Sequence, residues 1–274
     1  MTYVSLRLAR LECSPRLVLS AVGSVPTLLW VLIQASLPAA ALPAVNAQLE
    51  KQILETIQKH PEVILESLNR YHQRQEQKEA EKAQKVAEEI RKDPSSFVGE
   101  SPVLGDNQAS QYLFIFSDFQ CPFCAKAQSS LREFKRKHPE VALVYKHLPL
   151  TTIHPQAVNA AAASWAAQQQ GKFWSYHDIL LDNQSRFSDA YYEEVATQLG
   201  LNLVQFNRDR KSQSAYAAVA KDAELAERLG LKGTPFFIVN GQGVSGVVSS
   251  RDLEAMLSAS SPAFPNASVS NPSK

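Results

Sequence analysis

The feature that most limits what this chain can fold into is a pair of cysteines, Cys121 and Cys124, directly after a predicted buried strand. Residues 112–117 are almost entirely apolar and aromatic, which suits a strand buried on both faces of a sheet. A helical pattern follows over 121–138, and the apolar run 141–146 predicts a second strand. This order predicts a right-handed crossover between parallel strands, with Cys121 at the amino end of the helix.

That position predicts a reactive Cys121. Free backbone N–H groups and the positive end of the helix favour a thiolate over a thiol, whose pKa is otherwise about 8.5. Cys124 lies one turn further on, on the same side and deeper, where it can attack a mixed disulfide at Cys121 and release the partner. Pro122 costs no hydrogen bond in the first turn and fixes the geometry between the sulfurs. The pattern predicts thiol-disulfide exchange.

Cysteine usage leaves one other interpretation open. Cys13 is the only further cysteine, so no disulfide framework is present. Cysteines two residues apart also form half of a zinc site, but there is no second such pair and the histidines lack ligand spacing. We therefore expect no metal and no other cofactor. His147 and His154, which follow the second strand, are candidates for the rim of the site.

The first 47 residues have the pattern of a targeting segment. Arg7, Arg10 and Arg16 precede an apolar run without charge over 17–37, and small residues that suit a signal peptidase follow. A cleaved signal peptide is expected. A retained membrane anchor is the alternative, because the run approaches the ~20 apolar residues that span a bilayer. Either outcome predicts a periplasmic or otherwise extracytoplasmic location.

Residues 48–96 form a predicted helical segment ahead of the globular part. Apolar residues recur at helical spacing on both sides of Pro61, so two amphipathic helices are expected, broken there. After residue 70 the segment is rich in Glu, Lys, Gln and Ala, which predicts that it buries little surface. It is either a solvated stalk or, through residues 48–70, a contact that makes a homo-oligomer. A loop is expected over 99–105.

The second half combines a helical insertion with a late pair of strands. Alanine-rich and amphipathic stretches predict several helices between about residues 152 and 229. A strand is expected over 233–239, and an Asn-Gly turn leads into another over 244–248. A final helix over 251–258 precedes a tail, 260–274, that is rich in Ser, Pro and Asn and predicted to be disordered.

Together these features resemble the DsbA-like thioredoxin family over about residues 97–259. The Cys-Pro-Phe-Cys motif after a strand, Thr234-Pro235 opening a late strand and the helices between them agree with that family in order, and Gly171-Lys172-Phe173-Trp174 is similar as well. The resemblance implies an α/β fold: a thioredoxin fold with an inserted helical subdomain, preceded here by the N-terminal helical segment. It also implies that the bond before Pro235 is cis and lies against the cysteines, and that the backbone of Thr234 binds the substrate peptide.

Two details refine the resemblance. Phe123 stands where that family often has histidine. Phenylalanine neither donates a hydrogen bond to the thiolate nor carries charge, so it stabilises the reduced form less, and a less oxidising pair than DsbA is predicted. The leading segment, with His-Pro-Glu-Val-Ile over 60–64, resembles ScsC-type exported members, some of which oligomerise through it. That second resemblance adds disulfide isomerisation to oxidation.

We therefore expect an exported enzyme that exchanges disulfides with exported protein substrates carrying thiols or disulfides, as a dithiol oxidase or an isomerase. A membrane redox partner would reoxidise or reduce the pair. The formal charge of +1 implies no nucleic acid partner. The alternatives are a non-enzymatic exported adaptor that binds through its N-terminal helices, and a thiol peroxidase. The expected site consists of catalytic Cys121 and Cys124, active-site tuning by Pro122 and Phe123, and substrate binding by Thr234 and Pro235.

Overall fold

The structure is a computed structural model that describes residues 46–258. The predicted signal peptide or anchor, up to residue 45, and the predicted tail over 260–274 lie outside the described residues. Within 46–258, no helix combines the length and the apolar content needed to cross a bilayer. The chain divides into two units after His60.

Helix α1 (Ala47–Lys59) is the part of the first unit that the structure describes. The Asn46 side chain caps it by accepting a hydrogen bond of 3.0 Å from the backbone N–H of Gln48. No residue of α1 is buried within its unit, so its apolar side chains stay exposed. They share one face of the helix because they recur at helical spacing: Leu49, Ile53, Leu54 and Ile57.

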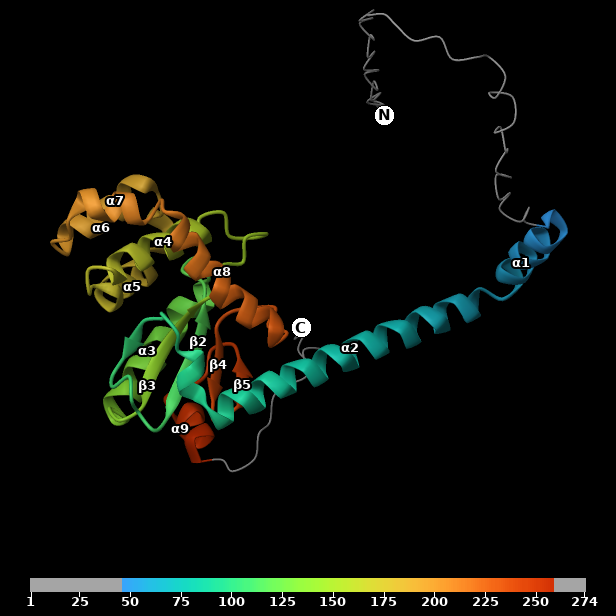
Figure 1. The fold of residues 1–274 in the computed structure, drawn as a ribbon, viewed down its shortest axis with the longest axis horizontal. Helices are drawn as coiled ribbons and strands as arrows, with labels where there is room; N and C mark the ends of the chain where they lie inside the picture. Colours follow the sequence, from blue (N-terminus) through green and yellow to red (C-terminus); the bar gives the residue numbers. More distant parts are fainter. Residues whose placement is uncertain (1–45, 259–274) are drawn as a thin grey trace, which may run out of the picture. The chain divides into compact units, whose positions relative to one another are not determined.

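The second unit is built on one mixed sheet of five strands, in the order β1-β3-β2-β4-β5 (Figure 1). Strand β2 is central, parallel to β3 and antiparallel to β4. Ser117 at the end of β2 lies opposite His147 at the end of β3, and Phe116 lies opposite Phe236 at the start of β4. The ends of β2 and β3 and the start of β4 therefore meet at one edge of the sheet. The strands are β1 (Val103–Leu104), β2 (Tyr112–Ser117), β3 (Ala142–His147), β4 (Phe236–Val239) and β5 (Gln242–Ser245).

Both faces of β2 are buried, as its apolar sequence predicts. Leu113 and Ile115 belong to one core, which includes side chains of helix α3 (Pro122–Lys137). Phe114 and Phe116 belong to a second core on the other face. The alternation follows from the two-residue period of a strand.

Helix α2 (Pro61–Lys92) corrects one expectation. Its last turns were expected to bury little surface, yet Val86 and Ile90 pack into the second core, where Ile90 is 2% exposed. Two large apolar residues are sufficient because the alanines beside them, Ala83 and Ala87, let the helix approach the sheet closely. The end of α2 is therefore part of the globular unit, and only its first half presents an exposed apolar face.

Helices separate the two halves of the sheet in sequence, as predicted. Hydroxyl or amide side chains cap three of them at Ser188, Asn202 and Ser212, each accepting a backbone N–H of the first turn. The helices of the insertion are α4 (Ala157–Gln168), α5 (Phe173–Asp182), α6 (Asp189–Gln198), α7 (Leu203–Asp209) and α8 (Gln213–Arg228), and α9 (Ser250–Ser258) follows β5.

Two strand predictions need correction. The expected loop over 99–105 contains β1, a two-residue strand that pairs antiparallel with β3 and is too short to give a periodic signal. The predicted strand over 244–248 is β5, which starts at Gln242 because Asn240 and Gly241 (φ 52° and 75°) form a two-residue turn. It ends before Gly246, whose φ is 86°. A Cβ at Gly241 would lie 2.8 Å from the carbonyl oxygen of Ala87 in α2, so the turn requires glycine for space as well as conformation.

Candidate active site

The two cysteines lie where β2 passes into α3, at the sheet edge described above. Cys121 is the N-cap residue of α3 and Pro122 its first residue, so the sequence prediction for this turn is confirmed. Both cysteines are free thiols, and each is almost wholly covered by protein: 4% of Cys121 and 1% of Cys124 is exposed. Pro122 and Phe123 stand out from the surface beside them, and Phe123 is 54% exposed.

The structure brings Thr234 and Pro235 to the same place. The antiparallel pairing of β4 with β2 sets the residues before Phe236 beside the end of β2. The Thr234–Pro235 peptide bond is cis. In its thiol form Cys121 donates a hydrogen bond of 3.3 Å from Sγ to the Thr234 carbonyl oxygen, across 113 positions of sequence. All six predicted site residues therefore gather within one small region.

The surroundings of Cys121 favour its thiolate. The Cys124 thiol, as a hydrogen-bond donor, is the largest influence, and it lowers the pKa of Cys121 to about 5 against the opposing effect of burial. The side chain of Thr234 and the backbone N–H groups of Cys124 and Phe123, at the start of α3, act in the same direction. The Thr234 hydroxyl has no other partner among the described residues, so it is free to donate to the sulfur.

Cys124 is shifted the opposite way. Burial raises its pKa far above the usual range, and the charge of the neighbouring Cys121 thiolate raises it further. The backbone N–H of Asp118 and the hydroxyl of Ser117 oppose that rise only in part. The pair is thus divided into one sulfur that is ionised at neutral pH and one that keeps its proton.

The loop before Cys121 is held by side chains that the sequence did not single out. The Asp118 carboxylate, fully buried, accepts hydrogen bonds from the backbone N–H groups of Gln120 and Leu150, both at 2.8 Å, and from Nδ1 of His154 at 2.7 Å. Gln184 donates from Nε2 to the carbonyl oxygens of Phe119 and Cys121, at 2.7 and 2.8 Å. Apart from the local bond between Gln120 and Asp118, these contacts join segments more than 30 positions apart, which no local sequence pattern predicts.

The two candidate histidines occupy different places. His154 is bound to Asp118 next to the motif, at 15% side-chain exposure, so it does lie near the site. His147 is buried under Phe119 with a ring-centroid separation of 6.1 Å, so it does not reach the rim. Among residues 46–258, no three His, Cys, Asp or Glu side chains are grouped to hold a metal ion.

The Thr234 side chain gives a direct test of how the thiolate is stabilised. Thr234→Val, which removes the hydroxyl but keeps the shape, is expected to raise the pKa of Cys121 above about 5, because the thiolate loses a donor. Alkylation of Cys121, which requires the thiolate, then reaches half its maximum at a higher pH than in the unmodified protein. Thr234→Ser is the matched control and keeps the low value; equal shifts in both variants would contradict the assignment.

Comparison with known proteins agrees with this geometry. The family model described as DSBA-like thioredoxin domain matches residues 113–258. A thioredoxin-like oxidoreductase from Silicibacter pomeroyi is 30% identical, with a TM-score of 0.53 over 58% of this chain and 91% of that one. ScsC from Proteus mirabilis in a transitional conformation is 22% identical, with a TM-score of 0.55 over 78% of this chain and 97% of that one. The thioredoxin fold predicted from the motifs is confirmed.

Curated relatives contain the matched region within a longer chain. The Na(+)/H(+) antiporter NhaA 3 of Salinispora tropica is 35% identical over 165 residues, which are 60% of this chain and 25% of that protein. The chain thus spans about a quarter of the length of such relatives. Fold, motif geometry and the family match lead to one conclusion: the chain belongs to the DSBA-like thioredoxin domain family, whose members are generally thiol-disulfide oxidoreductases.

Proposed function

We propose that the protein exchanges disulfides with exported protein substrates through Cys121 and Cys124. One observation carries this proposal: the two sulfurs share a helix start, yet the pKa of Cys121 is lowered to about 5 while that of Cys124 is raised. Neither zinc binding nor a purely structural role requires two cysteines whose pKa values are shifted in opposite directions. A dithiol that forms and resolves mixed disulfides requires it.

The reaction follows from the different positions of the two sulfurs, Cys121 at the start of α3 and Cys124 one turn inside it. In the oxidising direction a substrate thiolate attacks Cys121 of the Cys121–Cys124 disulfide, and Cys124 leaves and takes up a proton. A second substrate thiolate then attacks the substrate sulfur of the mixed disulfide, and Cys121 leaves as a stable thiolate. The substrate is oxidised by two electrons and the protein pair is reduced. Isomerisation or reduction runs through the same mixed disulfide in reverse.

Thr234 and Pro235 are proposed to position the substrate. The Thr234 carbonyl faces the Cys121 sulfur, so an extended peptide joined to Cys121 would lie alongside this segment. The exposed rings of Pro122 and Phe123, which follow Cys121 in the chain, offer an apolar surface to such a peptide. Lys126 lies over the Phe123 ring at 5.3 Å and adds a positive charge to that surface.

Location and redox partner are parts of the same proposal. The pattern of the first 47 residues supports export, to the periplasm or another extracytoplasmic space, where disulfides persist. A membrane redox partner is proposed to reoxidise or reduce the pair between turnovers. The adaptor and peroxidase alternatives draw no support from the paired thiols.

The exposed apolar faces of α1 and of the first half of α2 support a homo-oligomer through residues 48–70. On α2 these side chains are Val63, Ile64, Leu65 and Leu68, each more than 40% exposed. Exposed rows of this kind are expected to find an apolar partner, and a second copy of the same helix provides one.

Trapping experiments test the exchange reaction. Cys124→Ser is expected to accumulate a mixed disulfide at Cys121 with protein substrates that carry a disulfide, because the Cys121 thiolate attacks that disulfide and no second thiol resolves the product. Cys121→Ala is expected to form none and to lose all exchange activity, measured as reactivation of a reduced, disulfide-dependent enzyme. An adaptor would keep its function in Cys121→Ala, and a peroxidase would consume peroxide at a rate that depends on Cys121.

The reduction potential tests the role of Phe123. A Cys121 pKa of about 5 lies between the values of about 3.5 for DsbA and about 7 for thioredoxin, so the potential is expected to be more negative than about −120 mV and less negative than about −270 mV. Phe123→His is expected to raise it, because a cationic donor stabilises the thiolate. Phe123→Leu is the matched control. Equilibration with glutathione gives the values; a potential at or above that of DsbA would contradict the prediction.

Sedimentation tests the oligomer. Ile53→Glu and Leu68→Glu, one on each helix, are expected to convert an oligomer to monomer, because a buried unpaired charge opposes association. Lys51→Glu, at an exposed charged position of α1, is the control. If the unmodified protein is already a monomer at micromolar concentration, this part of the proposal is wrong, and the exchange chemistry is unaffected.

A further inference from the structure

Residues 148–156, which join β3 to α4, are bonded to the loop that precedes Cys121. The backbone N–H of Leu150 and the ring Nδ1 of His154 both donate to Oδ2 of Asp118, at 2.8 and 2.7 Å. An ionised carboxylate only accepts hydrogen bonds, so Nδ1 carries the proton in the contact with the ring. The exchange chemistry described so far gives this contact between a histidine and a carboxylate no role.

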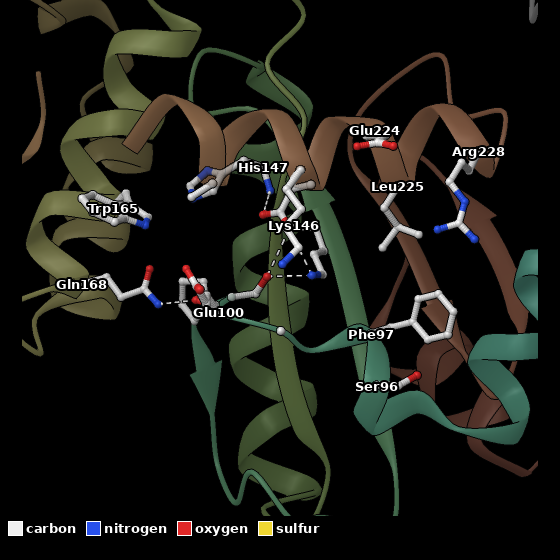
Figure 2. Close-up of a pocket in the computed structure, with 16 residues that line it drawn as sticks. Ser96, Phe97, Glu100, Lys146, His147, Trp165, Gln168, Glu224, Leu225 and Arg228 are labelled. Atoms are coloured by element: carbon white, nitrogen blue, oxygen red, sulfur yellow. Dashed lines mark hydrogen bonds and ion pairs between the residues drawn. The ribbon is translucent and has the colours of Figure 1, made fainter. Parts of the chain in front are cut away.

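The segment that carries this histidine is fixed at both of its ends. At its start, Lys146 Nζ and the backbone N–H of His147 donate to the two carboxylate oxygens of Asp222 in α8, each at 3.0 Å. Lys146 and His147 line the cavity of about 300 Å³ that Figure 2 shows, and dashed lines there mark the bonds of Lys146. At its end, the backbone N–H of Gln156 donates to Oε1 of Gln120. A segment bonded at both ends keeps a set position beside the motif.

Asp118 contacts both cysteines through its backbone. Its carbonyl oxygen accepts the backbone N–H of Cys121 at 3.1 Å. Its own N–H acts on the Cys124 sulfur and lowers the pKa of that thiol against the larger effect of burial. An N–H that is directed at a sulfur stabilises the thiolate more than the thiol. The orientation of the Asp118 backbone therefore affects how readily Cys124 becomes the attacking thiolate.

The Asp118 side chain holds that backbone in its orientation. The carboxylate is fully buried, at 0% exposure, and a buried charge without hydrogen bonds is strongly destabilising. Two of its donors are backbone N–H groups, those of Gln120 and Leu150, and the third is the His154 ring. Of these three donors, the ring is the one that a side-chain substitution can remove.

We propose that His154 is a positioning residue for the resolving step: through the Asp118 carboxylate it keeps the Asp118 N–H directed at the Cys124 sulfur. This inference rests on the proposed exchange function. It adds no bond to the step itself, in which the Cys124 thiolate bonds to the Cys121 sulfur and the substrate leaves as a thiolate. His154 acts before that step, on the share of Cys124 that is ionised.

The other cysteine is stabilised by different groups. The largest influences that lower the pKa of Cys121 are the Cys124 thiol, the Thr234 side chain and the N–H groups at the start of α3. Neither the Asp118 carboxylate nor His154 is among them. Loss of the His154 ring is therefore expected to slow resolution by Cys124 and to leave attack by Cys121 nearly unchanged.

Dithionitrobenzoate separates the two sulfurs. Reduced protein mixed with an excess of this reagent releases one coloured thiolate when Cys121 attacks it, and a second when Cys124 resolves the mixed disulfide. In His154→Leu the second phase is expected to slow at least fivefold at neutral pH, with the first phase within twofold of the unmodified protein. His154→Asn, whose amide N–H can replace the one at Nδ1, is expected to restore the second phase to within twofold. His138→Leu is the matched control, because that ring also bonds a carboxylate through Nδ1, that of Glu140 at 3.1 Å, but at the far end of α3.

The equilibrium with glutathione separates a positioning role from a merely structural one. In the stable reduced form Cys124 keeps its proton and in the oxidised form it has none, so the Asp118 N–H faces an ionised Cys124 in neither state. The equilibrium constant of His154→Leu is therefore expected to stay within twofold of the unmodified protein while resolution slows. Equal slowing of both phases, no slowing, no rescue by His154→Asn, or a larger change in the equilibrium constant would overturn the proposal.

Two further results have a defined meaning. If His154→Leu shows no cooperative melting, Asp118→Asn decides, because it removes the charge that the ring binds; the second phase is then expected to slow at least fivefold and the first to stay within twofold, and any other result contradicts the proposal. An unmodified protein that releases no second thiolate would instead refute the exchange function itself.

Discussion

The pairing of β2 with β4 is the contact on which the rest of the site depends. It joins the first strand of the motif to a strand more than a hundred positions later, and it alone brings Thr234 to Cys121. The parallel pairing with β3 completes the edge by adding His147. Shifting either register by one residue would exchange the side chains that β2 contributes to the two buried cores, so the packing of both cores holds the site in place.

Two thiols of the same kind, three positions apart, acquire opposite character from their surroundings. Cys121 lies at the open end of a helix, where backbone N–H groups and a hydroxyl stabilise its charge. Cys124 lies one turn inside, where the effect of burial on its pKa outweighs that of the Asp118 N–H and the Ser117 hydroxyl. The difference between the two pKa values requires no charged side chain beside the cysteines. It is therefore compatible with the uncharged Phe123 between them. It also means that each sulfur tunes the other, since the Cys124 thiol is the largest influence on Cys121.

Local signals in the sequence were sufficient for the motif and for every strand except β1, which is too short to give a periodic signal. The strand and helix around Cys121, the caps of the insertion helices and the Asn240-Gly241 turn all depend on neighbours in sequence. What was missed depends on distant partners. Asp118 and Gln184 hold the motif loop through contacts across more than 30 positions, and the end of α2 is buried because alanines fit against a sheet formed later in the chain. The roles of Thr234 and Pro235 were predicted from the resemblance to the family, because no local sequence pattern distinguishes Pro235 from the other prolines.

The close contact between Gly241 and the Ala87 carbonyl has a mechanical consequence. Because the glycine lets the turn pack directly against the buried end of α2, that end of the helix is fixed on the sheet. With a rise of about 1.5 Å per residue, the twenty-two steps from Leu68 to Ile90 span roughly 33 Å. Anything bound at the exposed part of α2 is thus held at a set distance from the sheet. In the proposed exchange reaction, that distance would limit which cysteines of a large, partly folded substrate reach the sulfur of Cys121.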